Sequence, residues 1–232
     1  MFLRYRKLVL ISGLSIFLSS IAVIPANGQN VLGEILKRMD AHNKALKTMT
    51  AGVTMVKYNP QLNTSDTTIG TASYISKVVN GKMYVRIDWT KPVEEQISVI
   101  GDEYELYRPR LQQVIVGKTQ SAKNSASVGG ALSFMTMSKD QLRTNYDVTY
   151  IGEEQISGGV RTWHLQLVPK SQTSYKSAEL WVDGDGMPRQ AKVIERNDDS
   201  NTVLLANISK NPALKGNIFK LSYPNSVKKI KA

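Results

Sequence analysis

The chain has 232 residues, and its 30 lysine and arginine residues against 19 aspartate and glutamate residues give a formal net charge of +11. It contains no cysteine, which excludes disulfides, thiolate metal sites and cysteine nucleophiles together. A basic balance suits anionic membrane surfaces or acidic partners, although an ordinary basic surface explains it equally well. No motif for binding nucleic acid is present, so we expect no nucleic-acid partner.

Residues 1–28 have the pattern of a cleavable secretory signal. Three basic residues lie within the first seven, residues 8–24 are almost purely apolar, and small residues follow at 25–28. We predict export, with cleavage between Gly28 and Gln29, which leaves a single domain at 29–232 with 27 basic and 19 acidic residues, net +8. A retained membrane anchor is the alternative, because the apolar stretch is near the lower limit of about 18 residues for a span.

The first element of that domain is predicted to be an amphipathic helix from Val31 to about Thr48. Apolar residues recur there at three- and four-residue spacing, which places them on one helix face. They are Leu32, Ile35, Leu36, Met39 and Leu46.

After the helix the apolar period changes to two, which predicts a series of short strands. The first covers about residues 53–58, and five more, joined by short turns, predict an antiparallel meander. We place these at 71–79, 83–89, 96–100, 104–107 and 111–116, with Asn80-Gly81 as the hairpin turn between the first two.

A helical segment, Ala131–Leu142, is predicted after a polar loop at 118–127, and Ser138 and Gln141 have the spacing of a capping box. Five more strands follow at 146–154, 161–169, 178–183, 189–196 and 202–209, and the C-terminus is a basic tail. The segment 183–186 has part of a calcium-loop pattern but lacks the later ligands, so a hairpin turn is the better interpretation.

This pattern predicts a mainly β fold of about 10–11 strands in one strongly curved antiparallel sheet, because so many consecutive strands must curl or close. The interior is then either filled by side chains or open to an apolar ligand.

The order of elements resembles the LolA family, periplasmic carriers of outer-membrane lipoproteins. The resemblance spans nearly all of residues 29–232 and rests on the N-terminal helix, the segments 70–92, 97–107 and 180–188, the central helical insertion, and the segment 207–224 with Phe219.

The resemblance implies an unclosed β-barrel covered by the N-terminal helix and the central helical segment, with an apolar cavity for acyl chains. It also implies a periplasmic monomer without a cofactor, whose partners are an acylated lipoprotein or lipid and membrane-bound donor and acceptor proteins. In the family an arginine of an early strand helps to hold the helical lid, whereas the corresponding region here offers only Lys77.

Flexible apolar side chains on the strands and in the central segment are the candidate ligand-contacting residues, since methionine adapts to varied apolar cargo. The same residues can instead simply fill the core. They are Met83, Val85, Ile87, Trp89, Leu132, Phe134, Met135, Met137, Trp163 and Leu165.

No catalytic motif or metal-ligand spacing is found, so we predict no enzyme, no catalytic residue and no metal site. His42 and His164 lie beside no obvious acid or nucleophile in the sequence, and we expect surface or satisfied histidines. The predicted function is a carrier of lipoprotein acyl chains or another lipid. The alternatives are a lipid- or lipoprotein-sensing regulatory module and a lipid- or glycan-acting hydrolase.

Overall fold

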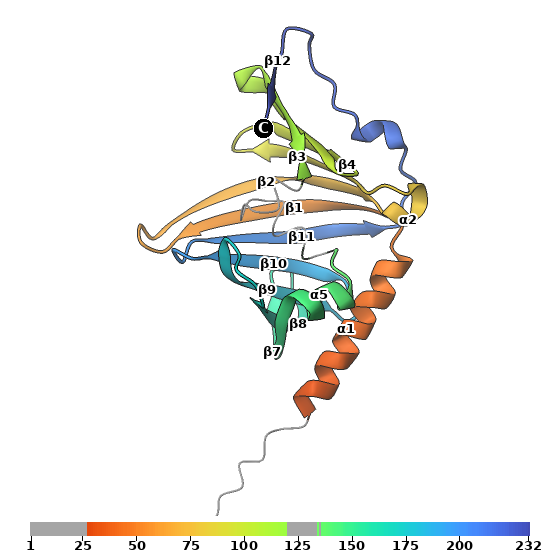
Figure 1. The fold of residues 1–232 in the computed structure, drawn as a ribbon, viewed down its shortest axis with the longest axis vertical. Coiled ribbons are helices and arrows are strands. Elements are labelled where there is room, and N and C mark those ends of the chain that lie inside the picture. The colour runs from red at the N-terminus through yellow and green to blue at the C-terminus, as the bar shows by residue number, and fades with distance from the viewer. Residues whose placement is uncertain (1–26, 120–133, 135) are drawn as a thin grey trace, which may run out of the picture.

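A twelve-stranded sheet forms most of the protein in a computed structural model that describes residues 27–119, 134 and 136–232 (Figure 1). The chain begins with α1 (Asn27–Ala45) and continues through β1 (Thr48–Asn59), β2 (Thr64–Ile75), α2 (Lys77–Asn80), β3 (Tyr84–Lys91), β4 (Glu95–Ile100) and β5 (Glu103–Arg108). The 3-10 turn η1 (Pro109–Leu111) leads to β6 (Gln113–Lys118). Then follow α5 (Lys139–Asn145), β7 (Tyr146–Ile156), β8 (Val160–Pro169), β9 (Tyr175–Asp183), β10 (Pro188–Glu195), β11 (Ser200–Lys210), η2 (Gly216–Phe219) and β12 (Lys228–Lys231).

The strands form one open sheet in the order β12-β6-β5-β4-β3-β2-β1-β11-β10-β9-β8-β7. Pairing of β1 with β11 joins two antiparallel meanders, and β12 adds to β6 in parallel. In the part of the chain that the structure describes, β12 and β7 are the two edges and do not pair with each other. The predicted fold class is therefore confirmed: a curved, mainly antiparallel sheet that does not close into a barrel. The strand beyond the expected ten or eleven is β12, which we had predicted to be a basic tail.

Helix α1 lies obliquely beside the half of the sheet that contains β7–β10 (Figure 1). Its predicted apolar face is correct, because Ile35, Leu36 and Met39 are each at most 1% exposed. The helix begins and ends earlier than we predicted. The side-chain oxygen of Asn211 accepts hydrogen bonds from the backbone N–H groups of residues 47 and 48, and these bonds turn the chain from the helix into β1.

The connection between β2 and β3 differs from the predicted two-residue turn. Strand β2 already ends at Ile75, and Val79 N–H donates to the carbonyl oxygen of Ser76 within the helical turn α2. Ile75 and Ser76 are both buried, so tertiary contacts override the local hairpin signal. Lys77 therefore starts α2 as an exposed residue and lies on no strand.

The capping box at the start of α5 is confirmed. The Ser138 hydroxyl accepts from the Gln141 N–H at 3.2 Å, and the Gln141 side chain accepts from the Ser138 N–H at 2.9 Å. Residues 131–133 and 135 of the predicted central helical segment, and the predicted signal at 1–26, lie outside the described residues.

Among the helices of the described ranges, none has the length and apolar character needed to cross a bilayer.

Candidate functional site

The face of the sheet that α1 and α5 cover, here called the inner face, carries an apolar cluster. On the half formed by β1 and β7–β11 this cluster is tightly packed. Leu165 on β8, Leu180 on β9 and Val203 on β11 have no exposed surface. Such a region is a close-packed core, with little room for a ligand.

The inner face of β3–β6 is apolar as well, but it is less completely covered. Directly opposed residues of an antiparallel pair share a face of the sheet. The register pairs Ile87 with Ile97, Ile97 with Leu106, and Leu106 with Ile115, so these four side chains form one row across four strands. Ile87 is buried, whereas the other three are partly exposed. We call this row, together with the similarly paired and partly exposed Val85, Val99 and Tyr104, the open half.

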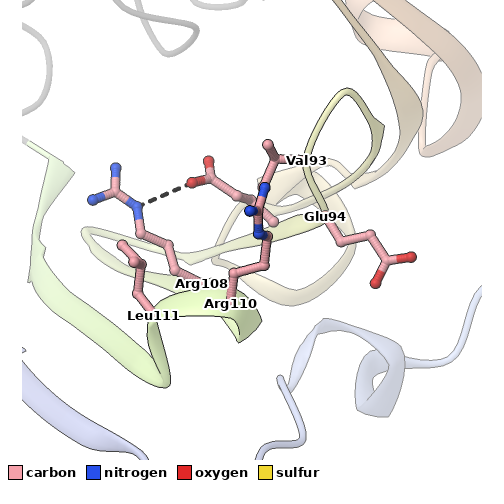
Figure 2. Close-up of a pocket in the computed structure, with 6 residues that line it drawn as sticks. Val93, Glu94, Arg108, Arg110 and Leu111 are labelled. Atoms are coloured by element: carbon pink, nitrogen blue, oxygen red, sulfur yellow. Dashed lines mark ion pairs between the residues drawn. The ribbon is translucent and has the colours of Figure 1, made fainter.

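An ion pair marks one end of the open half. Glu95 lies two residues before Ile97, and Arg108 lies two residues after Leu106, so both belong to the inner face. Arg108 Nε is 3.1 Å from the Glu95 carboxylate. The pair lines a shallow pocket of about 260 Å³ together with Val93, Glu94, Arg110 and Leu111. Figure 2 shows Arg108 among these residues, with a dashed line for its ion pair. The apolar surface thus ends in a charged rim.

Aromatic side chains hold part of the central segment against the packed half. Phe134 is 2% exposed, and its ring lies 5.5 Å from the ring of Tyr146 and 5.9 Å from that of Tyr175. The two tyrosine hydroxyl groups hydrogen-bond to each other at 2.7 Å. Burial, followed by this hydrogen bond, raises the pKa of the Tyr175 hydroxyl above its ordinary value.

Seven of the ten predicted ligand-contacting residues lie in the inner-face cluster or pack against it: Val85, Ile87, Trp89, Phe134, Met137, Trp163 and Leu165. Met83 lies in the connection before β3, while Leu132 and Met135 lie outside the described residues. Ile87, Trp89, Phe134 and Leu165 are packed core residues at 4% exposure or less.

The prediction omitted Ile97, Val99, Leu106 and Ile115, which are more exposed than those four. Their alternation along β4–β6 was visible in the sequence, and the pairing register would have been needed to bring them together.

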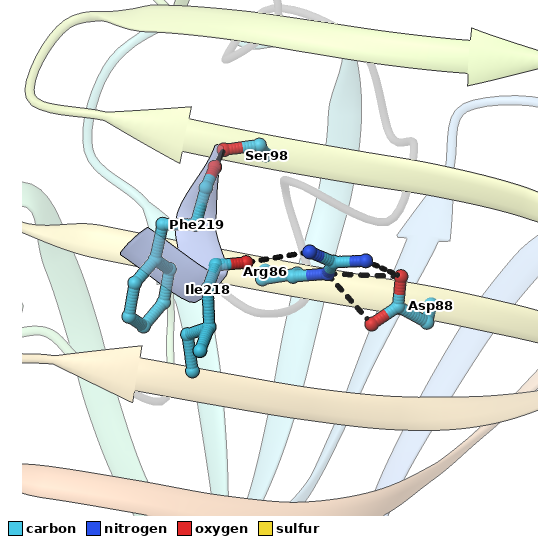
Figure 3. Close-up of polar contacts among 5 residues, drawn as sticks. All are labelled: Arg86, Asp88, Ser98, Ile218 and Phe219. Carbon is cyan, nitrogen blue, oxygen red and sulfur yellow. Dashed lines mark hydrogen bonds and ion pairs between the residues drawn. The ribbon is translucent and has the colours of Figure 1, made fainter. Parts of the chain in front are cut away.

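A C-terminal segment is clamped to the outer face of the sheet, as Figure 3 shows. Arg86 on β3 binds the Asp88 carboxylate through two nitrogens, at 2.8 and 2.9 Å, and donates from Nη1 to the carbonyl oxygen of Ile218 at 2.5 Å. The Ser98 hydroxyl on β4 donates to the carbonyl oxygen of Phe219, whose side chain is fully buried. These contacts hold η2 on β3 and β4, and the chain continues from there to the edge strand β12.

Both histidines differ from the expectation. His164 stacks on Trp181, with ring centroids 4.3 Å apart, and its Nδ1 lies 3.1 Å from the Glu154 carboxylate. It therefore has an acidic neighbour, supplied by the adjacent strand β7. His42 is buried, and its Nε2 has no hydrogen-bond partner among the residues that the structure describes. Burial, followed by the charge of Lys210, lowers the pKa of His42.

Comparison with known proteins decides the family. The model of the outer membrane lipoprotein carrier protein LolA matches residues 80–222, which is more than half of the chain. The chain belongs to the LolA family.

Curated members of the LolA family give the same result. An outer-membrane lipoprotein carrier protein of Haemophilus ducreyi is 29% identical over 143 residues, which are 61% of each chain. Another, of Pasteurella multocida, is 27% identical over 142 residues, or 61% of this chain and 62% of the relative. The match spans about three fifths of the length of these relatives.

Solved structures share the fold at low identity. An uncharacterized conserved protein from Thermus thermophilus has a TM-score of 0.54 at 12% identity, and the match covers 87% of this chain and 99% of that protein. The crystal structure of MucB has a TM-score of 0.51 at 16% identity, and the match covers 83% of this chain and 63% of MucB.

The part of the chain that matches the LolA family contains the open half and its clamp. Residues 80–222 run from the end of α2 to just beyond η2 and therefore include β3–β6, Arg86 and Phe219. The matched segment also contains the packed strands β7–β11, so it spans both halves of the inner face.

Proposed function

We propose that the protein is an exported carrier that shelters the acyl chains of lipoproteins, or of another lipid, and moves them through the periplasm toward the outer membrane. The observation that carries this proposal is the open half, a row of apolar side chains across β3–β6 that remains partly exposed on the inner face. Membership of the LolA family supports it, since the curated relatives that match the chain are named outer-membrane lipoprotein carrier proteins.

The physical need for such a carrier is large. A 16-carbon acyl chain has about 14 methylene groups, and burial of each contributes about 0.8 kcal/mol, so exposing the chain to water costs on the order of 10 kcal/mol. An apolar surface beside a packed core can offset this cost without any chemical step. Release then requires an acceptor that binds the cargo more tightly, and we propose membrane-bound donor and acceptor proteins as partners of a monomeric carrier.

In this proposal residues 29–232 are the carrier domain and residues 1–28 are removed on export. Helix α1 begins at Asn27, so cleavage after Gly28 would leave nearly all of the helix in the mature chain. The acyl chain would lie along the open half, and the predicted residues Val85, Ile87, Trp89 and Met137 would form its border with the packed half.

The experiment compares two isoleucines of β4 that face opposite ways. Ile97 belongs to the open half, and Ile100 points to the outer face, where it lines a shallow pocket beside the C-terminal segment. Both are partly exposed. We expect Ile97→Gln to weaken the binding of a fluorescent 16-carbon fatty acid by about tenfold or more, because it places an amide in the apolar surface. Ile100→Gln should bind like the unaltered protein.

Thermal unfolding of both variants controls for loss of the fold. An unaltered protein that shows no saturable binding of the probe would remove the carrier proposal. Equal loss of affinity in the two folded variants would place the acyl chain elsewhere. Mass spectrometry of apolar molecules that co-purify with the protein would identify the natural cargo.

A further inference from the structure

One end of the sheet combines an exposed leucine with unpaired cations. Strand β12 starts beside the turn after η1, because Lys228 N–H donates to the carbonyl oxygen of Gln112 at 2.9 Å. Figure 1 shows η1, drawn in yellow-green, next to β12. Leu111, at the end of η1, is 58% exposed. A leucine is thus presented to solvent next to Gln112, the residue whose carbonyl oxygen binds the first lysine of the edge strand.

Four cations lie on the same two elements: Arg110 on η1, next to this leucine, and Lys228, Lys229 and Lys231 on β12. Because successive side chains of a strand point to opposite faces, Lys228 lies on the inner-face side of the edge, and Lys229 and Lys231 lie on the outer-face side. All four are exposed, and none forms an ion pair within the described ranges. Lys229 lies over the ring of Tyr223, 5.6 Å from its centroid, with its charge still at the surface. We call these four residues and Leu111 the basic edge patch.

The surroundings of the basic edge patch leave its charge largely uncompensated. From residue 211 to the C-terminus the chain contains five lysines and no acidic residue. Of the two glutamates in the neighbouring pocket, Glu95 is paired with Arg108, and Glu94 is exposed (Figure 2). A third glutamate, Glu105, accepts a hydrogen bond from the hydroxyl of Tyr223, over whose ring Lys229 lies. Four cations thus stand against two glutamates, Glu94 and Glu105, that form no ion pair in the described part of the chain, which leaves a local excess of positive charge.

We propose that the basic edge patch docks the protein on a membrane surface that contains anionic lipids. Lysines near such a surface each contribute an electrostatic attraction, and an exposed leucine at the same edge of the sheet can enter the boundary between headgroups and acyl chains. Three of the four cations are lysines, whose compact charge demands no particular geometry from its partner and suits a diffuse anionic surface. This docking does not depend on the acyl cargo of the proposed function.

The turn between β1 and β2 provides an internal comparison. Leu62 is 71% exposed there, more than Leu111. Its turn, residues 60–63, contains no basic residue, and Lys57 is the nearest exposed cation in sequence. Leu62 and Leu111 are therefore both exposed leucines at turns. Leu111 has a cluster of lysines at the same edge of the sheet, whereas the turn of Leu62 has none.

The test is sedimentation of the purified protein with vesicles of phosphatidylcholine, either pure or with about 40% phosphatidylglycerol. We expect binding only to the anionic vesicles, and weaker binding at high salt, because surface charges are screened. The double variant Lys228→Gln/Lys229→Gln should lose roughly 25-fold in affinity, or about fivefold per lysine. Leu111→Ala should lose about threefold or more.

Matched variants make the result specific to this end of the molecule. Lys57→Gln and Leu62→Ala alter the same residue types at the β1–β2 turn and should bind like the unaltered protein, and thermal unfolding verifies that every variant is folded. Equal binding to neutral vesicles, or equal losses in the patch and control variants, would overturn the proposal. So would an absence of vesicle binding, the result expected if the patch serves an acidic protein. Probe binding by Ile97→Gln is measured separately, so failure of the docking surface and failure of the carrier function are distinguishable.

Discussion

Replacement of Gly186 by alanine should loosen the contact that places α1 on the sheet. Gly186 lies in the turn between β9 and β10 with φ at +84°, and a Cβ atom there would lie 2.4 Å from the carbonyl carbon and oxygen of Arg38. These are backbone atoms of the helix, so no side-chain rotation can relieve the overlap. Arg38 is also anchored to the same turn, because its Nη1 donates to the carbonyl oxygen of Gly184 at 3.0 Å.

Two terms set the size of the effect. A left-handed conformation costs a residue other than glycine about 1–2 kcal/mol. Relief of an overlap in a packed region costs about 1–3 kcal/mol more. The total of about 2–5 kcal/mol corresponds to a fall in Tm of roughly 5–15 °C for a domain of this size. Since α1 supplies Ile35, Leu36 and Met39 to the inner-face cluster, its displacement should also expose part of that cluster.

Thermal and urea unfolding measure this loss, and Gly184→Ala is the matched control. A Cβ atom at Gly184 has no neighbour within 4 Å, so that variant should stay within about 0.5 kcal/mol of the unaltered protein. If Gly186→Ala proved as stable as Gly184→Ala, the close packing of α1 on this turn would be refuted.

Two further predictions concern pH and export. Burial and the charge of Lys210 lower the pKa of His42 in the folded protein below its ordinary value of 6.5. As the pH falls below 6.5, the unfolded chain therefore binds a proton at this imidazole more readily than the folded protein does. The free energy of unfolding should decrease over this pH range. Replacement of His42 by glutamine should flatten the slope of the free energy of unfolding between about pH 5 and 7 in urea titrations, and an unchanged slope would contradict the assignment. Intact-mass analysis of protein recovered from the cell envelope should find a chain that starts near Gln29, whereas a mass that retains residues 1–28 would disprove cleavage.

Much of the fold was predictable because local and tertiary preferences agree. The amphipathic period of α1, the alternation in β3–β6 and the capping box of α5 each have a local cause that tertiary packing reinforces. The prediction was wrong where the two conflict. Burial of Ile75 and Ser76 replaced the Asn80-Gly81 hairpin by α2, and parallel pairing with β6 converted the basic tail into β12.

The candidate site was only partly predictable, because exposure depends on what lies above each strand. The sequence placed Ile87 and Trp89 on one face, and they do share the inner face, where both are almost completely buried. Ile97 and Leu106 have the same alternation but are partly exposed. Periodicity assigns a side chain to a face and contains no information on its distance from α1.

By itself the sequence determined the class of the molecule: a cysteine-free, mainly β domain behind a predicted export signal, with an element order that resembles the LolA family. These properties follow from composition, periodicity and the spacing of turns. The tertiary structure alone decided which half of the apolar inner face is packed and which is open, because that depends on the pairing of β1 with β11 and on the half of the sheet that α1 covers. It also decided that Leu111 and the C-terminal lysines, more than a hundred residues apart in the chain, lie at one end of the sheet, because β12 pairs with β6.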